Sequence, residues 1–463
     1  MKLSSIIVMT LLSLILFFTK VNAQSLTWLG TLGGETSNAY DVSDDGTIVV
    51  GESETYGGNT RAFIWTPGTG MQPLTNLQNI SSWAVHISSD GNSVIGTART
   101  INGINYQAIR WWRNDGVITF LGTLGGSGSF NNSEGYSCNA DASIIVGTAA
   151  ASNNSRHAFK WTASGGMEDL GTFGNVANRF SAATGISDDA SLIVGHSEYG
   201  GSYTRPCFWL NGSINELLTA FATSIERGEV TNVSPNGNYI CGWIDDSTTF
   251  SNENAYLWSG NPSFTGFDIG LLPLVALDQG TSKAFDVNDN GEVVGTATDT
   301  LYEDNAFYWY YGVIENLNLT YGSIIPFGSK LISANAISNN GRYIVGQGYN
   351  VATNRNEAFL LDRGGATSIE NSEELPNNFS LEQNYPNPFN PSTKINWQSP
   401  VGIHQTLKVY DVLGKEVAIL VDEYRDSGKY EVEFNAEKLS SGIYFYKLQS
   451  GSFTETKKMI LLR

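Results

Sequence analysis

A short hairpin recurs along most of this chain, and no other feature constrains its fold as strongly. The first copy, "VSDDGTIVVG", ends at Gly51. The glycine that closes the hairpin returns every 45 to 53 residues. The seven equivalent positions are Gly51, Gly96, Gly147, Gly195, Gly242, Gly295 and Gly346. Such a period lies in the range of four-stranded propeller blades and exceeds that of most helical repeats.

A complete copy contains four short runs with the alternating pattern of antiparallel strands. In the first copy the runs are "AYDVS", "TIVVGE", "RAFIW" and "MQPL". The turn between the first two runs opens with Ser or Asn, carries Asp or Asn at its third position and usually ends in glycine. Such turns satisfy themselves through Asx hydrogen bonds, which favours a structural role over calcium binding. Ala142 and Ala190 replace the glycine in two copies, where we expect a strained or differently closed turn.

Tryptophan ends the third run in most copies. Each sheet of a propeller buries both faces against its neighbours, so we expect these rings to pack between sheets rather than to stack on ligands. The positions are Trp65, Trp111, Trp161, Trp209, Trp258 and Trp309, with Leu361 in the seventh copy.

The two ends of the repeat region complement each other. The seventh copy has no convincing fourth strand after residues 357–361. Residues 25–34, "SLTWLGTLGG", precede the first copy and match the fourth-strand text "VITFLGTLGG" of another copy. We therefore expect an all-β fold in which residues 24–363 form a seven-bladed β-propeller whose N-terminal strand closes the last blade.

The third run resembles a known repeat. "HAFKW", residues 157–161, carries the His-Ala-Phe signature of the extracellular HAF repeat family. Three other copies keep its Ala-Phe core, at Ala62-Phe63, Ala306-Phe307 and Ala358-Phe359. The resemblance covers roughly residues 26–363, and its motifs specify strands and turns. It implies an extracellular propeller and brings no catalytic signature.

The composition changes after Arg363. Residues 364–379 are polar and acidic without an apolar period, as expected of a linker. Residues 380–463 begin with prolines interleaved with asparagine and continue as strands separated by glycine turns, with a hairpin about Leu413-Gly414. Strands of this size predict a small Ig-like β-sandwich.

This last segment resembles, along its full length, the C-terminal sorting domain (type A, Por) of cargo for the type IX secretion system of Bacteroidota. The residues that carry the resemblance are Pro386, Asn387, Pro388, Phe389, Asn390, Pro391, Gly414, Gly442, Tyr444, Lys458 and Met459. The resemblance implies that the type IX apparatus is the partner of residues 380–463 and that the protein is secreted, extracellular or at the cell surface. The alternative is an Ig-like linker or adhesion module without a sorting role.

The remaining composition agrees with export. Residues 1–23 combine a basic start, an apolar run that is short for a membrane span and a small-residue cleavage site, which predicts a secretory signal peptide. No other segment is apolar enough to predict a stable membrane span. A formal net charge of −19 without a basic stripe argues against a nucleic-acid partner.

The residues that usually carry chemistry are sparse. Cys138, Cys207 and Cys241 are too few and odd in number for a disulfide framework, which favours buried thiols over a disulfide or metal site. The four histidines, His86, His157, His196 and His404, have no zinc or dyad spacing. No nucleophile elbow is recognisable, and the glycine-rich "GTLGGSGSF" lacks the lysine and helix of a phosphate loop. We expect no catalytic residue, metal or other cofactor.

The loops between the second and third strands are long and divergent, and they share one face of a propeller with the inter-blade loops. Their aromatic residues are candidates for stacking on sugars, with solvated loop surface as the alternative. They are Tyr56, Tyr106, Tyr199, Tyr203, Trp243, Tyr302 and Tyr349. Loop carboxylates are candidates for a glycosidase acid–base pair at about 5 to 10 Å separation, again with solvated loop as the alternative. They are Asp245, Asp246, Glu303 and Asp304.

Two functions are consistent with this pattern. The first is a non-enzymatic binding or interaction module with a carbohydrate or protein ligand. The second is a polysaccharide-acting hydrolase or lyase that uses the loop face. Fold alone decides neither, but the lack of a recognisable catalytic group favours the first.

Overall fold

The computed structural model describes residues 24–77, 79–100, 103–127, 131–153, 155–176, 178–200, 203–218, 227–245, 253–273, 280–364, 379–399, 403–425, 428–450 and 453–462. The expected signal peptide (residues 1–23), most of the expected linker (365–378) and Asp246 lie outside these ranges. Apart from the short helix α1 (Leu317–Thr320) and a 3-10 turn at Phe173–Asn175, every described element is a strand. This confirms the all-β prediction.

The middle of the repeat region forms five four-stranded antiparallel sheets, each from four consecutive strands. The first is β6 (Ser82–Ile87), β7 (Ser93–Arg99), β8 (Tyr106–Trp112) and β9 (Ile118–Phe120). The second is β10 (Ser133–Cys138), β11 (Ile144–Ala150), β12 (Arg156–Thr162) and β13 (Gly166–Asp169). The third is β14 (Ser181–Ile186), β15 (Ile193–Glu198), β16 (Thr204–Leu210) and β17 (Ser213–Glu216). The fourth is β18 (Arg227–Val233), β19 (Tyr239–Asp245), β20 (Glu253–Ser259) and β21 (Thr265–Gly270). The fifth is β22 (Ser282–Val287), β23 (Val293–Thr298), β24 (Asp304–Tyr310) and β25 (Val313–Asn316).

The first and seventh copies of the repeat belong to one eight-stranded sheet. Its first-copy strands are β2 (Gly33–Val42), β3 (Val49–Thr55), β4 (Thr60–Thr66) and β5 (Gly70–Pro73). Its seventh-copy strands are β26 (Lys330–Ile337), β27 (Tyr343–Asn350) and β28 (Arg355–Asp362). The N-terminal strand β1 (Ser25–Gly30) pairs with β28 in antiparallel register, Ser25 opposite Asp362. A single parallel bridge between Thr36 and Asn356 links the two copies.

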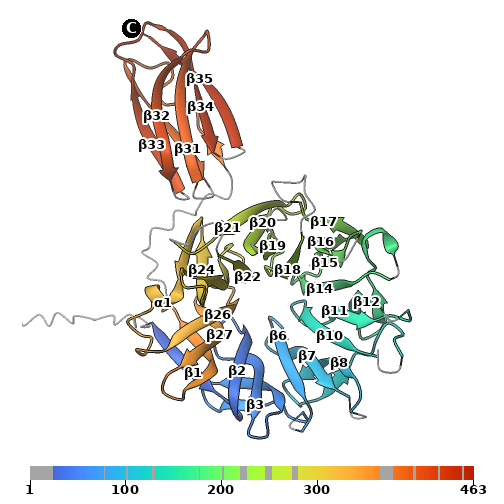
Figure 1. Cartoon of the computed structure of the whole chain (residues 1–463). Coiled ribbons are helices and arrows are strands. Elements are labelled where there is room, and N and C mark those ends of the chain that lie inside the picture. The colour runs from blue at the N-terminus through green and yellow to red at the C-terminus, as the bar shows by residue number, and fades with distance from the viewer. Residues whose placement is uncertain are drawn as a thin grey trace, which may run out of the picture.

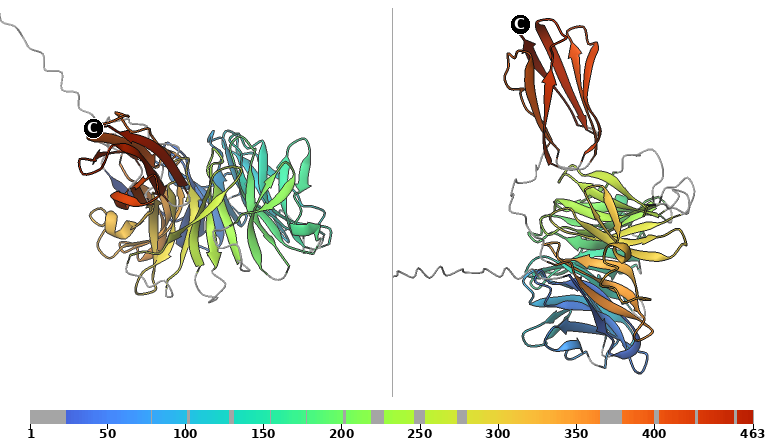
Figure 2. Two further views of the ribbon diagram at one scale, coloured as in Figure 1. Left: turned by 90° about the horizontal axis from the view of Figure 1, so that it is seen from above. Right: turned by 90° about the vertical axis from the view of Figure 1, so that its left-hand side faces the viewer.

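The sheets stand side by side around a common axis, with the first strand of each copy innermost (Figures 1 and 2). The innermost strands contact one another in succession from β2 through β6, β10, β14, β18 and β22 to β26, and β26 contacts β2. Among the described strands, the sheets do not join into one closed sheet, so packing and side-chain hydrogen bonds hold them together. This is the architecture of a β-propeller.

The repeated tryptophans pack between sheets, as the sequence predicts. Trp111 lies in a buried cluster with Ile48 and Leu74 of the preceding copy, and its Nε1 donates to the Thr75 carbonyl oxygen at 3.2 Å. Trp209 and Trp258 donate in the same way to the carbonyl oxygens of Leu170 and Leu218. These three indoles therefore bury their rings and satisfy their polar atoms at the junction with the preceding sheet.

The hairpin turns satisfy themselves and one another. The Asp45 carboxylate accepts from the Ser43 hydroxyl at 2.7 Å and the Thr47 N–H at 2.9 Å, and the other copies repeat this pattern with few changes. This confirms the predicted Asx hydrogen bonding. Backbone N–H groups of six turns also donate to the next turn, from the second copy round to the first, ending with the Asn339 N–H and Asp44 Oδ1 at 2.7 Å. The hairpin turns are therefore hydrogen-bonded to one another in succession at one end of the axis.

Ala142 and Ala190 adopt the strained backbone that the sequence predicts, with φ of 53° and 59°. We expect Ala190→Gly to raise the free energy of unfolding by about 0.5 kcal/mol, because a left-handed backbone strains any residue with a Cβ. Gly237, at the equivalent turn of the fifth copy, has φ of 72°. Gly237→Ala should lower the free energy by about 0.5–1 kcal/mol. Urea denaturation of both variants tests this, and a change of the same sign in both would contradict it.

The C-terminal segment forms two further sheets. One contains β29 (Ser380–Leu381), β30 (Ser392–Ser399) and β33 (Gly428–Asn435). The other has the order β32 (Glu416–Arg425), β31 (Ile403–Asp411), β34 (Gly442–Ser450) and β35 (Phe453–Leu461). Trp397 and Phe434 of the first sheet share one buried core with Leu407 and Tyr446 of the second. The hairpin predicted about Leu413-Gly414 joins β31 to β32, which confirms that part of the prediction.

Candidate functional site

A bulge in every innermost strand turns two consecutive residues toward the axis. In β2 the register shifts between Ala39 and Asp41, so that Tyr40 and Asp41 both avoid the core. The same shift occurs in β6, β10, β14, β18, β22 and β26. The repeated glycine lies opposite each bulge, and a Cβ at Gly51 would collide with the Asn38 carbonyl oxygen. The hairpin glycine is therefore the residue that lets each copy line a channel.

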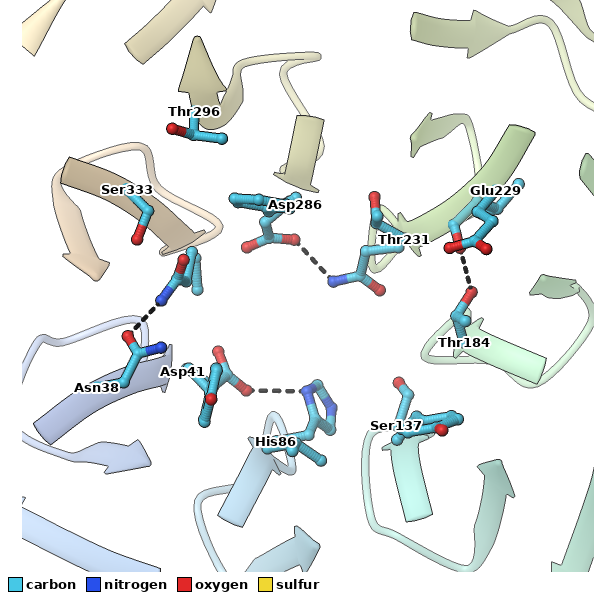
Figure 3. A pocket seen from close by; sticks show the side chains of 18 of the residues that line it. Asn38, Asp41, His86, Ser137, Thr184, Glu229, Thr231, Asp286, Thr296 and Ser333 are labelled. Atoms are coloured by element: carbon cyan, nitrogen blue, oxygen red, sulfur yellow. Dashed lines mark hydrogen bonds and ion pairs between the residues drawn. The ribbon is translucent and has the colours of Figure 1, made fainter. Parts of the chain in front are cut away.

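The channel widens into a cavity of about 590 Å³. Most of the residues that line it carry a polar group, and they come from every copy of the repeat, as Figure 3 shows for the labelled residues. Residues nearer the turns, including Asp44, Asp188 and Asn339, line a separate pocket of only about 100 Å³. A hydrogen bond of 2.8 Å between Ser89 Oγ and Asp188 Oδ1 connects the second and fourth copies there. The roomier part of the channel therefore lies on the side of the long loops.

An aspartate–histidine pair joins the first two copies inside the channel (Figure 3). His86 Nδ1 lies 2.8 Å from Asp41 Oδ2. The Asp41 carboxylate also accepts from the N–H groups of Val42 at 2.7 Å and Ile87 at 2.8 Å. Burial opposes protonation of His86, but the Asp41 charge and hydrogen bond outweigh it and hold the pKa of His86 well above its usual value. The pair is therefore ionic at neutral pH.

Asp286 occupies the equivalent position in the sixth copy and ties three copies together. Its Oδ1 accepts from Asn232 Nδ2 at 2.7 Å and the Val287 N–H at 2.8 Å, and its Oδ2 accepts from the Ile337 N–H at 2.8 Å. The residue is only 8% exposed. Burial raises the pKa of Asp286 to about 7, the Ile337 hydrogen bond lowers it in part, and the Asp41 charge raises it further.

Replacement of Asp286 by alanine should lower the free energy of unfolding by about 3 kcal/mol, because two buried N–H groups lose their acceptor. The cost should depend on pH. An unfolded aspartate titrates near pH 3.9, so a folded pKa of about 7 means that the protonated side chain stabilises the fold. That contribution is complete below about pH 4 and is lost as the pH rises to about 7.

Urea denaturation of wild-type protein and Asp286→Ala at pH 4.5 and pH 8 measures both effects. We expect the difference between the two proteins to be larger at pH 4.5. If wild type and Asp286→Ala were equally stable at each pH, this would contradict the structural role of the carboxyl group. A larger difference between the two proteins at pH 8 than at pH 4.5 would contradict the direction of its pKa shift.

In three copies the innermost strand carries a charged residue just before the bulge, on the side of the long loops. This residue pairs with the residue that follows the hairpin glycine. These residues are Glu134, Glu229 and Lys283. Glu134 pairs with Arg156 at 2.8 Å and accepts from the Tyr136 hydroxyl at 2.6 Å, and Lys283 pairs with Glu253 at 2.7 Å. Glu229 lines the cavity and forms no hydrogen bond or ion pair through its side chain with another described residue. It is therefore an unmatched charge inside the channel.

The predicted aromatic residues are only partly brought together. Tyr199 and Tyr203 lie at the two ends of one loop, where the Tyr199 N–H donates to the Tyr203 carbonyl oxygen at 3.1 Å. The Arg205 guanidinium lies 4.2 Å from the Tyr199 ring centroid. The other five come from five different copies, and none of the seven is among the described residues that line the cavity.

Those five residues have different surroundings. Tyr56 and Tyr302 are 96% and 64% exposed. The Tyr106 ring packs 5.3 Å from Trp83, and the Tyr349 hydroxyl donates to Asn354 at 2.7 Å. Three of these residues lie in strands and not in the loops that the sequence predicts. Tyr106 begins β8, and Tyr349 lies in β27. Trp243 lies within β19 and is buried against Arg227 and Lys283. The alternation of β19 turns this indole inward, one residue after Gly242.

The loop carboxylates are also dispersed. Asp245 ends β19, where it is buried 3.9 Å from Arg227, while Glu303 and Asp304 belong to the next copy. Glu303 forms an ion pair with Lys330 at 2.8 Å, and Asp304 lines the channel cavity. Cys138, Cys207 and Cys241 are buried free thiols, as predicted. Within the described ranges, no three His, Cys, Asp or Glu side chains gather as a metal site requires.

The sorting-motif residues meet at one edge of the C-terminal sheets. Phe389 is buried, its N–H donates to the Ile460 carbonyl oxygen at 2.9 Å, and its own carbonyl accepts from Leu462. Asn387 Oδ1 accepts from the Ile460 N–H at 2.9 Å. The proline-rich start therefore lies along the final strand β35, which contains Lys458 and the buried Met459.

The other motif residues shape turns and core. Gly414 has φ of 79° at the β31–β32 hairpin. Tyr444 follows Gly442 at the start of β34, and its hydroxyl donates to the Ser440 carbonyl oxygen at 2.8 Å. The motif residues that are exposed, and that a partner can therefore contact, are Pro386, Pro388, Asn390, Pro391, Gly414, Gly442 and Lys458.

Sequence comparison decides the nature of this segment. Residues 383–462 match the secretion system C-terminal sorting domain family. The sorting domain indicates a secreted or cell-surface protein. No curated protein matches the sequence of the chain significantly. In the described part of the chain, no helix is both long and apolar enough to cross a membrane.

Solved structures with similar folds include several propellers. TolB from Acinetobacter baumannii is 10% identical, with a TM-score of 0.38 over 69% of this chain and 80% of its own. The β-propeller domain of the Trilobed protease from Pyrococcus furiosus is 14% identical, with a TM-score of 0.46 over 70% and 95%. Prolyl oligopeptidase B from Galerina marginata is 10% identical, with a TM-score of 0.39 over 80% and 55%.

Proposed function

We propose that this protein is a non-enzymatic binding module that is exported by the type IX secretion system and takes a carbohydrate or protein ligand at the loop-side mouth of its central channel. The observation that carries the proposal is the cavity of about 590 Å³, whose polar groups converge from all seven copies. Cavities of this size that bring a few polar groups together are the usual sites of ligand binding.

The architecture that presents this cavity is part of the proposal. Residues 24–363 are proposed to be a seven-bladed propeller of HAF repeats, closed by β1 on the last blade. Support comes from the pairing of β1 with β28 and from the mutual contacts of the seven innermost strands. Residues 1–23 are proposed to be a signal peptide that precedes the sorting step. Exposed Tyr199 and Tyr203 on the loop face are proposed to extend the ligand surface beyond the cavity.

The polar groups inside the channel support binding rather than catalysis. Asp41 and Asp286 each accept backbone N–H groups from two copies, and His86 is tied to Asp41, so these groups serve the structure of the ring. The remaining hydroxyl and amide groups, among them Asn38, Thr231 and Ser333, suit recognition of a polar ligand.

The test is a binding screen of the chain from Gln24 to Arg463 against immobilised polysaccharides and peptides, with parallel analysis of each bound material for cleavage products. We expect saturable binding of at least one ligand without product. Product formation would overturn the non-enzymatic function. Failure of every carbohydrate and peptide to bind would overturn the binding function itself.

A further inference from the structure

Glu229 stands apart among the channel charges. At the same position of the repeat, Glu134 is neutralised by Arg156, and Lys283 is neutralised by Glu253. Glu229 faces the cavity without such a partner among the described residues. A carboxylate that is partly withdrawn from water gains most from a counter-ion, because charge–charge attraction is stronger there than in bulk solvent.

The surroundings of Glu229 add to its negative potential. His86 balances Asp41, which leaves Glu229, Asp304 and a fraction of Asp286 as net charge on the lining. No lysine or arginine is among the described residues that line this cavity. A concave site lined by one sign of charge concentrates ligands of the opposite sign.

His196 lines the same cavity as Glu229. The fourth copy carries the small residues Ala182, Thr184 and Gly185 in its innermost strand, so His196 of the next strand reaches the cavity lining. His196 is 8% exposed, and its Nδ1 has no hydrogen-bond partner among the described residues. Burial lowers the pKa of His196, although the Glu229 charge opposes that shift, so the imidazole is neutral at pH 7. The Nδ1 atom is therefore a buried polar group beside Glu229 that the described residues leave unsatisfied.

Aromatic rings complete the lining. Tyr40, Tyr136 and Phe285 all contribute to the cavity. The hydroxyl groups of Tyr40 and Tyr136 donate to Glu52 at 2.8 Å and Glu134 at 2.6 Å, which fixes both side chains. Aromatic rings next to a carboxylate form a favourable environment for an organic cation, because the ring face attracts positive charge.

We propose that the channel cavity binds a ligand through an ammonium or guanidinium group, with Glu229 as its counter-ion. This inference rests on the proposed binding function and specifies the chemistry that the cavity recognises. The cation enters from the loop side, since the turn side narrows to a pocket of about 100 Å³. The group belongs either to a free polyamine or to a basic side chain of a peptide.

Isothermal titration calorimetry on the chain from Gln24 to Arg463 tests the proposal. The probes are spermidine, an acetylated and amidated Gly-Lys-Gly peptide, the same peptide with norleucine in place of lysine, and neutral disaccharides. We expect the wild-type protein to bind spermidine or the lysine peptide and not the norleucine peptide. Glu229→Gln should weaken that binding at least about tenfold, or about 1.4 kcal/mol, because removing one partner of a partly buried charge pair leaves the other charge unpaired.

Glu168→Gln is the matched control, because it makes the same change of net charge on the exposed outermost strand β13. This variant should bind like wild type, and circular dichroism should show both variants folded. Binding of spermidine alone identifies a free polyamine, and binding of the lysine peptide alone identifies a basic segment. Equal affinity of Glu229→Gln and wild type, or no binding of either amine, would overturn the proposal. Disaccharide binding without amine binding would overturn it while leaving the proposed binding function intact.

Discussion

Removal of residues 24–30 is expected to lower the free energy of unfolding of the propeller by about 5 kcal/mol. These residues contain β1, which pairs with β28 along its length. Leu29 is buried, and Leu26 and Trp28 pack against the core of the seventh copy, where Trp28 meets Phe359 edge-on at 6.2 Å. Burial of three large apolar side chains accounts for most of the expected loss, at roughly 1.5–3 kcal/mol each.

The deletion should also expose the hydrogen-bonding edge of β28, which favours aggregation on heating. Urea denaturation followed by tryptophan fluorescence measures the stability, and light scattering follows aggregation. Trp28→Ala is a milder comparison that keeps the strand and should cost about 3 kcal/mol. A deletion variant with wild-type stability would show that β1 contributes nothing to closure of the ring.

Truncation after Arg363 is the second change with a large expected effect. It removes the sorting domain at residues 383–462 and leaves every propeller strand in place. We expect the truncated protein to accumulate in the periplasm and to fall to background at the cell surface and in the medium, because the secretion apparatus loses the domain that it recognises. Immunoblots of medium, surface and periplasmic fractions from a host with an active type IX system measure this.

A folding control separates recognition from misfolding. The truncated protein should keep a β-rich circular dichroism spectrum and the melting transition of the propeller, since the propeller's buried clusters contain no residue beyond Leu361. Undiminished export of a folded truncation would contradict the sorting role of the tail.

Much of the fold could be predicted from the sequence because the same residue types recur at the same positions in successive copies of the repeat. The hairpin glycine, the Asx turn and the third-strand tryptophan each recur at a fixed position, and each has one structural cause. The glycine faces a bulge, the Asx side chain closes the turn, and the tryptophan packs on the preceding sheet. The left-handed backbone of Ala142 and Ala190 followed from the same alignment.

The candidate site was harder to predict because its residues are defined by a bulge. Strict alternation would place Tyr40 and Asp41 on opposite faces of β2, whereas the register shift turns both toward the axis. The position of Asp41 recurs as His86, Asn232 and Asp286, so variation at one fixed repeat position was the available signal. Loop divergence pointed instead to exposed tyrosines such as Tyr56 and Tyr302, which do not line the cavity.

The most direct test of the channel as the ligand site is a binding isotherm with the channel filled. Ser333 lies on β26 and lines the cavity, so Ser333→Trp should occupy the space with an indole. Ser213→Trp, on the exposed edge of β17, adds the same side chain outside the channel. We expect the ligand found in the screen to bind wild type and Ser213→Trp equally and to lose its affinity for Ser333→Trp. Equal binding to all three folded proteins would contradict the central claim and move the site to the outer surface.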